Sequence, residues 1–190
     1  QETAFVQGEV TVGDNVRRDL KVTLTGNLKS ISVNGKREPL ARYLGQLQVF
    51  SFTAAELEVV RGASDARRRF IDRGVASLHP GYVQTVADYG RVIKQKNRIL
   101  QDANEQGLPL LEVEDLISPW NEQLVGLAWE VHSARCDYIR RINEALERGL
   151  FEQRDVHINY VSSLEGKGDL TEYKLLIGQR LGLRLQAELA

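Results

Sequence analysis

Residues 82–100 read YVQTVADYGRVIKQKNRIL, and this stretch decides the fold. Its apolar residues recur in steps of 4, 3, 4 and 7, at Tyr82, Val86, Tyr89, Ile93 and Leu100. Such steps place the apolar side chains along one side of an α-helix. Heptad-like spacing of this kind is typical of helices that pack nearly antiparallel to a neighbour. The stretch therefore predicts one helix of a long helical hairpin.

A shorter helix is predicted before this stretch. Ser64 is expected to cap it, because a side-chain oxygen can accept a hydrogen bond from the free N–H groups of the first turn. The helix should run to about Leu78 and stop before Pro80, since the residue before a proline disfavours the helical conformation.

A third helix is predicted after it, with an apolar seam from Trp120 to Ala145 and a length on the order of 40 Å. Between the second and third helices, Gly107–Pro109 and the acidic stretch Glu112–Asp115 interrupt the apolar pattern. We expect these two segments to separate the helices.

The first 60 residues are β-rich in pattern. Asp19–Thr25 alternates apolar and polar side chains with the period of 2 that is typical of a half-buried strand. Asn34-Gly35 favours a type I′ hairpin turn, because both residues accept positive φ angles. Further strands are predicted over residues 4–12, 29–33, 47–52 and 156–161, with a helical turn over 42–46 and a final helix from about Leu170.

Together these elements predict an α+β fold, mostly helical, in which a long-helix arm is inserted into an antiparallel β base. The predicted ranges are 1–62 for the β-rich piece, 63–152 for the arm and 153–190 for a returning strand and helix.

The formal net charge of −1 hides a segregation of charge along the chain. Residues 61–100 contain nine basic and three acidic groups, whereas residues 101–132 contain seven acidic groups and no Lys or Arg. Two explanations stand. Either two antiparallel helices neutralise each other's surfaces, or an exposed basic stripe binds phosphate.

The basic side chains that are candidate contacts to DNA or to a protein partner are Arg67, Arg68, Arg69, Arg73, Lys94, Lys96 and Arg98. A guanidinium group can hold a phosphate through two hydrogen bonds. It can equally pin one helix to another through Asp or Glu. Arg69 and Arg73 are i, i+4 neighbours and share a helix face. The sequence leaves both roles open.

The chain contains no recognisable catalytic motif. It has no phosphate loop of the form Gly-x-x-x-x-Gly-Lys-[Ser/Thr], no Gly-x-Gly-x-x-Gly and no His-Glu-x-x-His. A single cysteine, Cys136, excludes an internal disulfide framework and a Cys-based zinc site. We expect no catalytic, cofactor-binding or metal-binding residue here. Because the chain has no Met and begins at Gln1, we expect it to be part of a longer polypeptide.

Residues 49–72, VFSFTAAELEVVRGASDARRRFID, resemble a segment of the RecF family of recombination and repair ATPases. In that family a strand ending in Phe-Ser is followed by Pro-Glu-Asp-Leu, a Gly, and Arg-Arg-x-Phe-Leu-Asp at the first arm helix. The chain departs from this pattern at residues 53–56 and at Ile71. Three further pieces resemble the family in the same order: Val33-Asn34-Gly35-Lys36, Lys96-Asn97-Arg98-Ile99-Leu100 and Trp120-Asn121-Glu122-Gln123-Leu124.

The resemblance implies an ABC-type ATPase head, like those of SMC and Rad50 proteins, with a short helical arm. It implies that the Walker A loop precedes Gln1 and that the signature and Walker B motifs follow Ala190. On this interpretation ATP and Mg²⁺ are cofactors of the complete protein, which is a weak ATPase, and the present chain alone is inactive.

For the complete protein, the resemblance implies a cytoplasmic protein of DNA replication, recombination, repair and the SOS response. It implies an ATP-bound homodimer that binds single-strand/double-strand DNA junctions. Its protein partners are RecR and RecO, with which this dimer helps load recombinase at single-strand gaps. The resemblance implies no membrane as a partner. The alternative is a partner-docking arm of another SMC- or Rad50-like ATPase.

Overall fold

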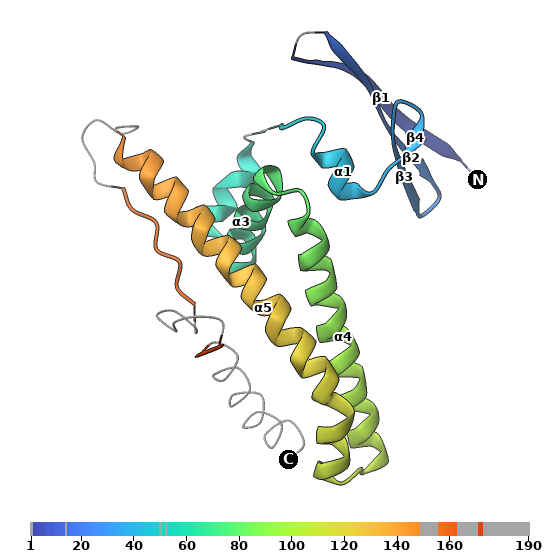
Figure 1. The fold of residues 1–190 in the computed structure, drawn as a ribbon, viewed down its shortest axis with the longest axis vertical. Coiled ribbons are helices and arrows are strands. Elements are labelled where there is room, and N and C mark those ends of the chain that lie inside the picture. Colours follow the sequence, from blue (N-terminus) through green and yellow to red (C-terminus); the bar gives the residue numbers. More distant parts are fainter. Residues whose placement is uncertain are drawn as a thin grey trace. The chain divides into compact units, whose positions relative to one another are not determined.

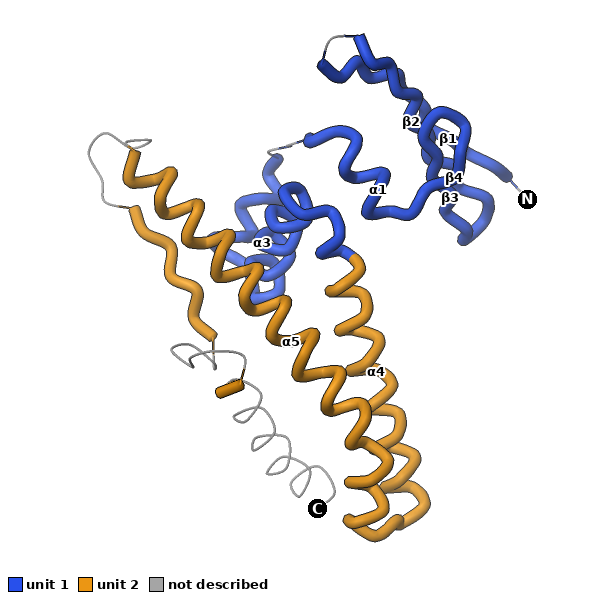
Figure 2. The backbone as a smooth tube through the Cα atoms, in the orientation of Figure 1, with its two compact units in different colours: residues 1–83 blue, residues 84–190 orange. Residues whose placement is uncertain are grey.

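A small antiparallel sheet precedes a series of helices along the chain (Figure 1). The computed structural model describes residues 2–13, 15–49, 51, 53–148, 156–162 and 171–172. These residues fall into two compact units, residues 1–83 and 84–190, and each unit is described by itself (Figure 2). The predicted division into head and arm at residues 62/63 and 152/153 is not tested by these units and stays a prediction.

The sheet has the order β1-β2-β3-β4, with every neighbouring pair antiparallel. Its strands are β1 (Thr3–Val12), β2 (Val16–Thr25), β3 (Leu28–Val33) and β4 (Lys36–Arg37). The strands predicted over 4–12, 19–25 and 29–33 are confirmed. The hairpin between β3 and β4 turns at Asn34 and Gly35, whose φ angles are 51° and 76°, as a type I′ turn requires.

The strand predicted over residues 47–52 is wrong where the structure describes it. Residues 47–49 and 51 form no strand, and Phe50 and Phe52 lie outside the described residues. The side-chain amide of Gln48 instead donates to the carbonyl of Ser77 at 3.0 Å. A short apolar run does not by itself show whether the segment pairs with a strand or packs against a helix.

Four short helical segments complete the first unit. They are α1 (Leu40–Leu44), the 3₁₀ turn η1 (Ala54–Leu57), α2 (Glu58–Arg61) and α3 (Ser64–Leu78). The predicted helical turn and the end of α3 before Pro80 are confirmed. The capping role predicted for Ser64 is wrong, because the N-cap residue is Ala63 and no side chain caps the helix. The Ser64 hydroxyl accepts a hydrogen bond from Arg68 at 3.2 Å instead.

The second unit is built on α4 (Tyr82–Gln106) and α5 (Leu110–Glu147), which are joined by a short turn at Gly107. The helix predicted from residue 82 is confirmed. The break predicted at Glu112–Asp115 is wrong: α5 begins directly after Pro109, contains that acidic stretch and is 38 residues long. At 1.5 Å per residue its length is about 57 Å, which exceeds the predicted length.

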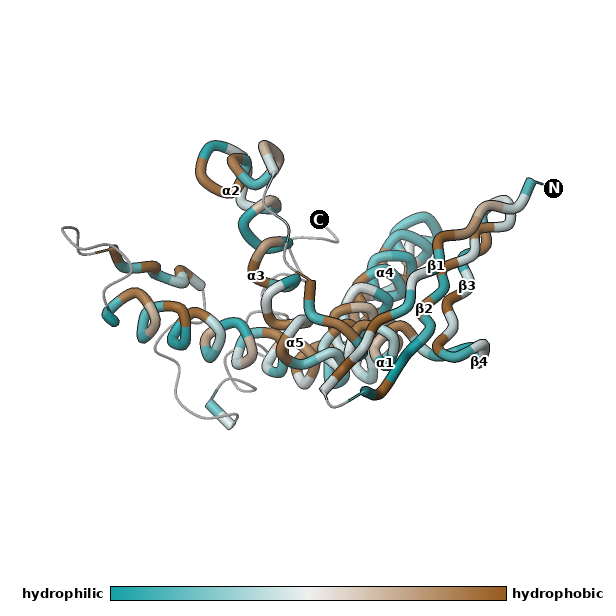
Figure 3. Tube along the Cα trace, turned by 90° about the horizontal axis from the view of Figure 1, so that it is seen from above, coloured by the Kyte–Doolittle hydropathy of each residue, from teal (hydrophilic) through white to brown (hydrophobic). Residues whose placement is uncertain are grey.

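The apolar seam explains why α5 starts so early. Val113 and Ile117 are almost fully buried together with Ala103 of α4, and Ile99 and Leu108 pack against them. At the other end of the pair, the Thr85 hydroxyl lies 3.4 Å from the Glu130 carboxylate. The contacts therefore extend over most of α4 and over the first half of α5, as far as Glu130. Figure 3 shows hydrophobic and hydrophilic residues alternating along α5, as an amphipathic helix requires.

The strand predicted over residues 156–161 is also wrong. These residues are described, but they carry no strand assignment. Thr171 and Glu172 are helical, and the rest of the helix predicted from Leu170 lies outside the described residues. Among the helices that the structure describes, none combines the length and the apolar composition that a membrane span requires.

We predict that the α4–α5 seam carries much of the stability of the second unit. Ile117→Ala should lower the free energy of unfolding by about 2–5 kcal/mol, because it leaves a cavity in a site that is 1% exposed. Leu111→Ala on the same helix is the matched control, since Leu111 is 71% exposed and should change stability by about 0.5 kcal/mol or less. Equal losses in guanidinium denaturation would contradict the packing described here.

Candidate functional site

The four candidate arginines of α3 are exposed, and three of them have a partner close in the chain. Arg69 contacts Asp65 at 2.6 Å, and Arg68 contacts the same carboxylate at 3.6 Å. Arg67 donates to the carbonyl of Gly62 at 2.9 Å. These interactions lie within α3 or join it to the segment directly before it.

Arg73 differs because its partner comes from another element. Its guanidinium lies 3.7 Å from the Glu56 carboxylate, which belongs to η1. Glu56 is held in turn by a capping box: the Thr53 backbone N–H and hydroxyl donate to it at 2.7 and 2.6 Å. These Thr53 hydrogen bonds lower the pKa of the Glu56 carboxyl below its usual range, and the charge of Arg73 adds to the effect. Glu56 is therefore fixed as an anion beside Arg73.

On α4, three cations share one exposed face. Arg91, Lys94 and Arg98 follow one another at i, i+3 and i+7, so they form a row along the helix. Arg91 contacts Asp88 at 2.8 Å and Arg98 contacts Asp102 at 3.8 Å. Among the carboxylates that the structure describes, none forms an ion pair with Lys94. Arg91 was not among the sequence-based candidates, although the same spacing rule would have included it.

Lys96 does not belong to this row. Lys96 is only 7% exposed, whereas Lys94 and Arg98 on either side of it are exposed. A helix turns by about 200° over two residues, so Lys96 lies on the other side of α4 from its two basic neighbours. Its ammonium group is consequently not presented to a phosphate on the exposed face.

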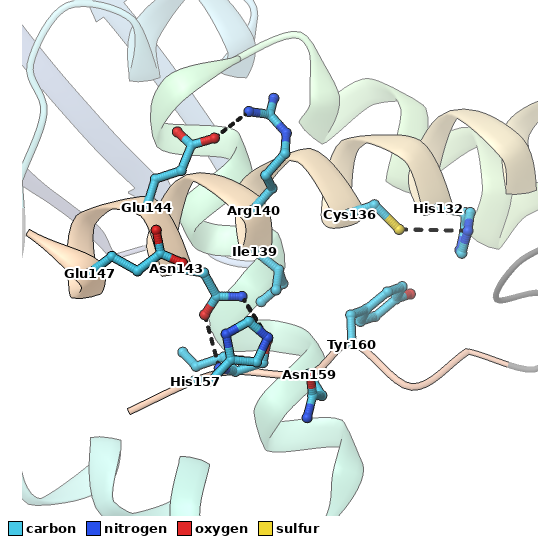
Figure 4. A pocket seen from close by; sticks show the side chains of 11 residues that line it. His132, Cys136, Ile139, Arg140, Asn143, Glu144, Glu147, His157, Asn159 and Tyr160 are labelled. Atoms are coloured by element: carbon cyan, nitrogen blue, oxygen red, sulfur yellow. Dashed lines mark hydrogen bonds and ion pairs between the residues drawn. The ribbon is translucent and has the colours of Figure 1, made fainter. Parts of the chain in front are cut away.

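A pocket of about 430 Å³ lies along the last third of α5, between this helix and residues 157–160 (Figure 4). On the helix side, Arg140 donates to Glu144 at 2.7 Å and also contacts Asp137 at 3.4 Å. These two carboxylates raise the pKa of the Arg140 guanidinium, with Glu144 the larger cause. The pocket's cation is thus already neutralised by its own helix.

The same pocket contains Cys136, whose sulfur lies 3.6 Å from Nε2 of His132 one turn earlier on α5. Two ligating side chains are too few to hold a metal ion by themselves. Across the described residues, no group of three His, Cys, Asp or Glu side chains is placed to bind a metal.

Comparison with known proteins finds relatives that share one name. The DNA replication and repair protein RecF of Citrifermentans bemidjiense is 34% identical over 147 residues, which are 77% of this chain and 38% of the relative. The chain belongs to the RecF family. RecF of Lactobacillus johnsonii is 32% identical over 141 residues, which are 74% of this chain and 37% of the relative. RecF of Shouchella clausii is 28% identical over 155 residues, covering 77% and 40%.

This RecF-family chain spans about two-fifths of the length of the curated RecF proteins that it matches. No protein-family profile matches it. The solved structure of the recombination mediator protein RecF-ATPrS in the RecFOR pathway matches all of this chain and 52% of that one, with a TM-score of 0.86 and 20% identity. That likeness concerns the fold, and it confirms the predicted α+β class with a helical insertion.

The capping box generates a pH prediction. In Thr53→Ala the pKa of the Glu56 carboxyl should rise part of the way toward its ordinary value, because the largest cause of its lowering, the hydrogen bond from the Thr53 hydroxyl, is removed while the backbone N–H still donates. A carboxyl whose pKa is lower in the folded state stabilises the fold above its ordinary pKa. That stabilisation is lost as the pH falls through the lowered pKa. NMR titration of the Glu56 side-chain carbon measures the change.

Ser64→Ala is the matched control for this titration, because its hydroxyl contacts Arg68 and not Glu56. The control should leave the Glu56 pKa as it is in the unmodified protein. An identical Glu56 pKa in Thr53→Ala and in the unmodified protein would show that the capping box does not hold this carboxylate.

Proposed function

We propose that this chain is part of an ATP-dependent DNA-binding repair protein that acts at single-strand gaps. The complete protein would act in the cytoplasm as an ATP-bound homodimer and help load recombinase with RecR- and RecO-type partners. Two findings support this proposal. The relatives are named DNA replication and repair proteins, and the solved neighbour is a recombination mediator in the RecFOR pathway.

The observation that carries the DNA-binding part of the proposal is the row Arg91, Lys94 and Arg98 on α4. Its three cations span eight residues, or about 10 Å along the helix axis, so one strand of phosphates can follow them. The carboxylates Asp88 and Asp102 lie at its two ends. Lys94 lies between them and forms no ion pair with a carboxylate of the described residues, so a phosphate can bind it without displacing one.

The arginines of α3 supply a second set of contacts. Arg69 and Arg73 share a helix face, and their side chains are 70% and 65% exposed. Exposed ion pairs of this kind contribute about 0–1 kcal/mol each. Arg69 and Asp65 are both exposed, so a DNA phosphate can replace Asp65 as the partner of Arg69 at little cost.

For ATP and Mg²⁺ we propose contacts from other parts of the complete protein. The sequence has no phosphate loop, and no acidic group of three is placed for a metal among the residues described. The residues that the structure describes do not fit either cofactor, so no step of ATP hydrolysis is assigned to them. We predict that residues 1–190 alone show no turnover in an ATPase assay, and turnover above a buffer control would contradict this assignment.

DNA binding by the complete protein provides the main test. Lys94→Ala and Arg73→Ala should each weaken binding to duplex DNA about equally for all sequences. Each should also lower the slope of log affinity against log salt by about 1, because each removes one phosphate contact. Fluorescence anisotropy with labelled duplexes, titrated at several salt concentrations, measures both quantities.

Arg17→Ala is the matched control for lost positive charge. Arg17 is exposed and contacts Glu9 at 3.5 Å, a separation close to that of Arg73 and Glu56, but it lies in β2. The control should leave the salt slope as in the unmodified protein. If Lys94→Ala and Arg73→Ala behave like Arg17→Ala, these helices do not bind DNA, and the arm is a protein-docking element instead.

A further inference from the structure

The segment 156–162 is held to α5 by a side chain that takes the place of a neighbouring strand. The amide nitrogen Nδ2 of Asn143 donates to the carbonyl of Ile158 at 2.9 Å. The backbone N–H of Ile158 donates back to Oδ1 of Asn143, also at 2.9 Å. A strand in a sheet receives the same pair of bonds from its neighbour. Asn143 therefore binds the backbone of an extended segment without regard to the Ile158 side chain.

Aromatic contacts fix the same segment two residues further along. The ring of Tyr160 lies 5.7 Å from the ring of His132, within the range of aromatic pairing. Arg135 lies with Nη1 3.5 Å from the Tyr160 hydroxyl. Because alternate residues of an extended segment point the same way, Ile158 and Tyr160 both meet α5. In Figure 4 the Asn143 and Tyr160 side chains line the same pocket.

The segment is exposed over much of its length. Val156 and Val161, near the two ends of the segment, are exposed, and Val161 is 84% exposed. Ile158 is 36% exposed, and both of its hydrogen bonds with Asn143 lie at the surface. A segment with little buried apolar area and surface hydrogen bonds opens at low free energy. The contacts thus give the segment a defined register on α5 without burying it.

We propose that α5 carries a docking site for an extended polypeptide, centred on Asn143 and His132, and that residues 156–162 occupy it as a releasable latch. The site selects an extended backbone at Asn143 and an aromatic side chain two residues later. Its occupant is the chain's own segment, which follows α5 in sequence after residues 148–155. Release of the latch uncovers the pocket side of α5.

The first test is hydrogen exchange of the Ile158 amide in the complete protein. Asn143→Ala should speed its exchange by tenfold or more, because the acceptor of that amide is removed. Asn104→Ala, an exposed asparagine on α4, is the matched control and should leave the exchange unchanged. Equal Ile158 exchange in Asn143→Ala and in the unmodified protein would overturn the proposal.

A second test asks whether the site accepts the segment from outside. Ile158→Pro removes the N–H that Oδ1 of Asn143 accepts, so it should free the site in the complete protein. A labelled peptide with the sequence of residues 156–162, VHINYVS, should then bind saturably, and at least tenfold more weakly to the unmodified protein. Adding Asn143→Ala to Ile158→Pro should abolish peptide binding. Binding that is the same in all three proteins would overturn the proposal.

Discussion

The apolar seam between α4 and α5 is the constraint on which the second unit depends. Val113 and Ile117 are buried against Ala103 near the connecting turn, and Thr85 meets Glu130 towards the other end. A helix that gives one face to this seam must give its other face to solvent. The basic row of α4 is a feature of such an outward face, and the latch site lies further along α5, between His132 and Glu147. The seam thus positions the charges and the docking surface without contributing a functional group of its own.

Charge is balanced locally on the helices that carry the candidate residues. The arginines of α3 and α4 contact Asp65, Glu56, Asp88 and Asp102, all within the same or a neighbouring element. Of these four carboxylates only Asp102 belongs to the acidic residues 101–132, so most of the partners of the basic groups over residues 61–100 lie outside that stretch. Surface ion pairs are weak and easily exchanged. A helix face that is nearly neutral in the absence of DNA can still bind a polyanion when phosphates replace the carboxylates as partners of its basic side chains.

The sequence predicted the elements that obey a local rule and missed those set by distant partners. The β3–β4 hairpin and α4 follow from Asn34-Gly35 and from the heptad spacing. The early start of α5 was also readable, because Val113 and Ile117 extend the seam in steps of 4 and 3 to Trp120. The acidic residues and the proline at this point of the sequence led to the prediction of a break instead. The segment after residue 155 has the alternation of a strand, but its partner is a helix side chain, which no local pattern indicates.

The burial of Lys96 was readable too, because Lys96 lies three residues after Ile93 and four before Leu100 and so fills the gap of seven in the apolar seam. The most direct test of the account is a structure of the complete protein bound to a single-strand/double-strand junction with ATP. The account predicts that Lys94 and its neighbours Arg91 and Arg98 lie within hydrogen-bond distance of DNA phosphates, with Lys96 still buried. A complex in which this row faces solvent or a protein partner, away from DNA, would contradict it.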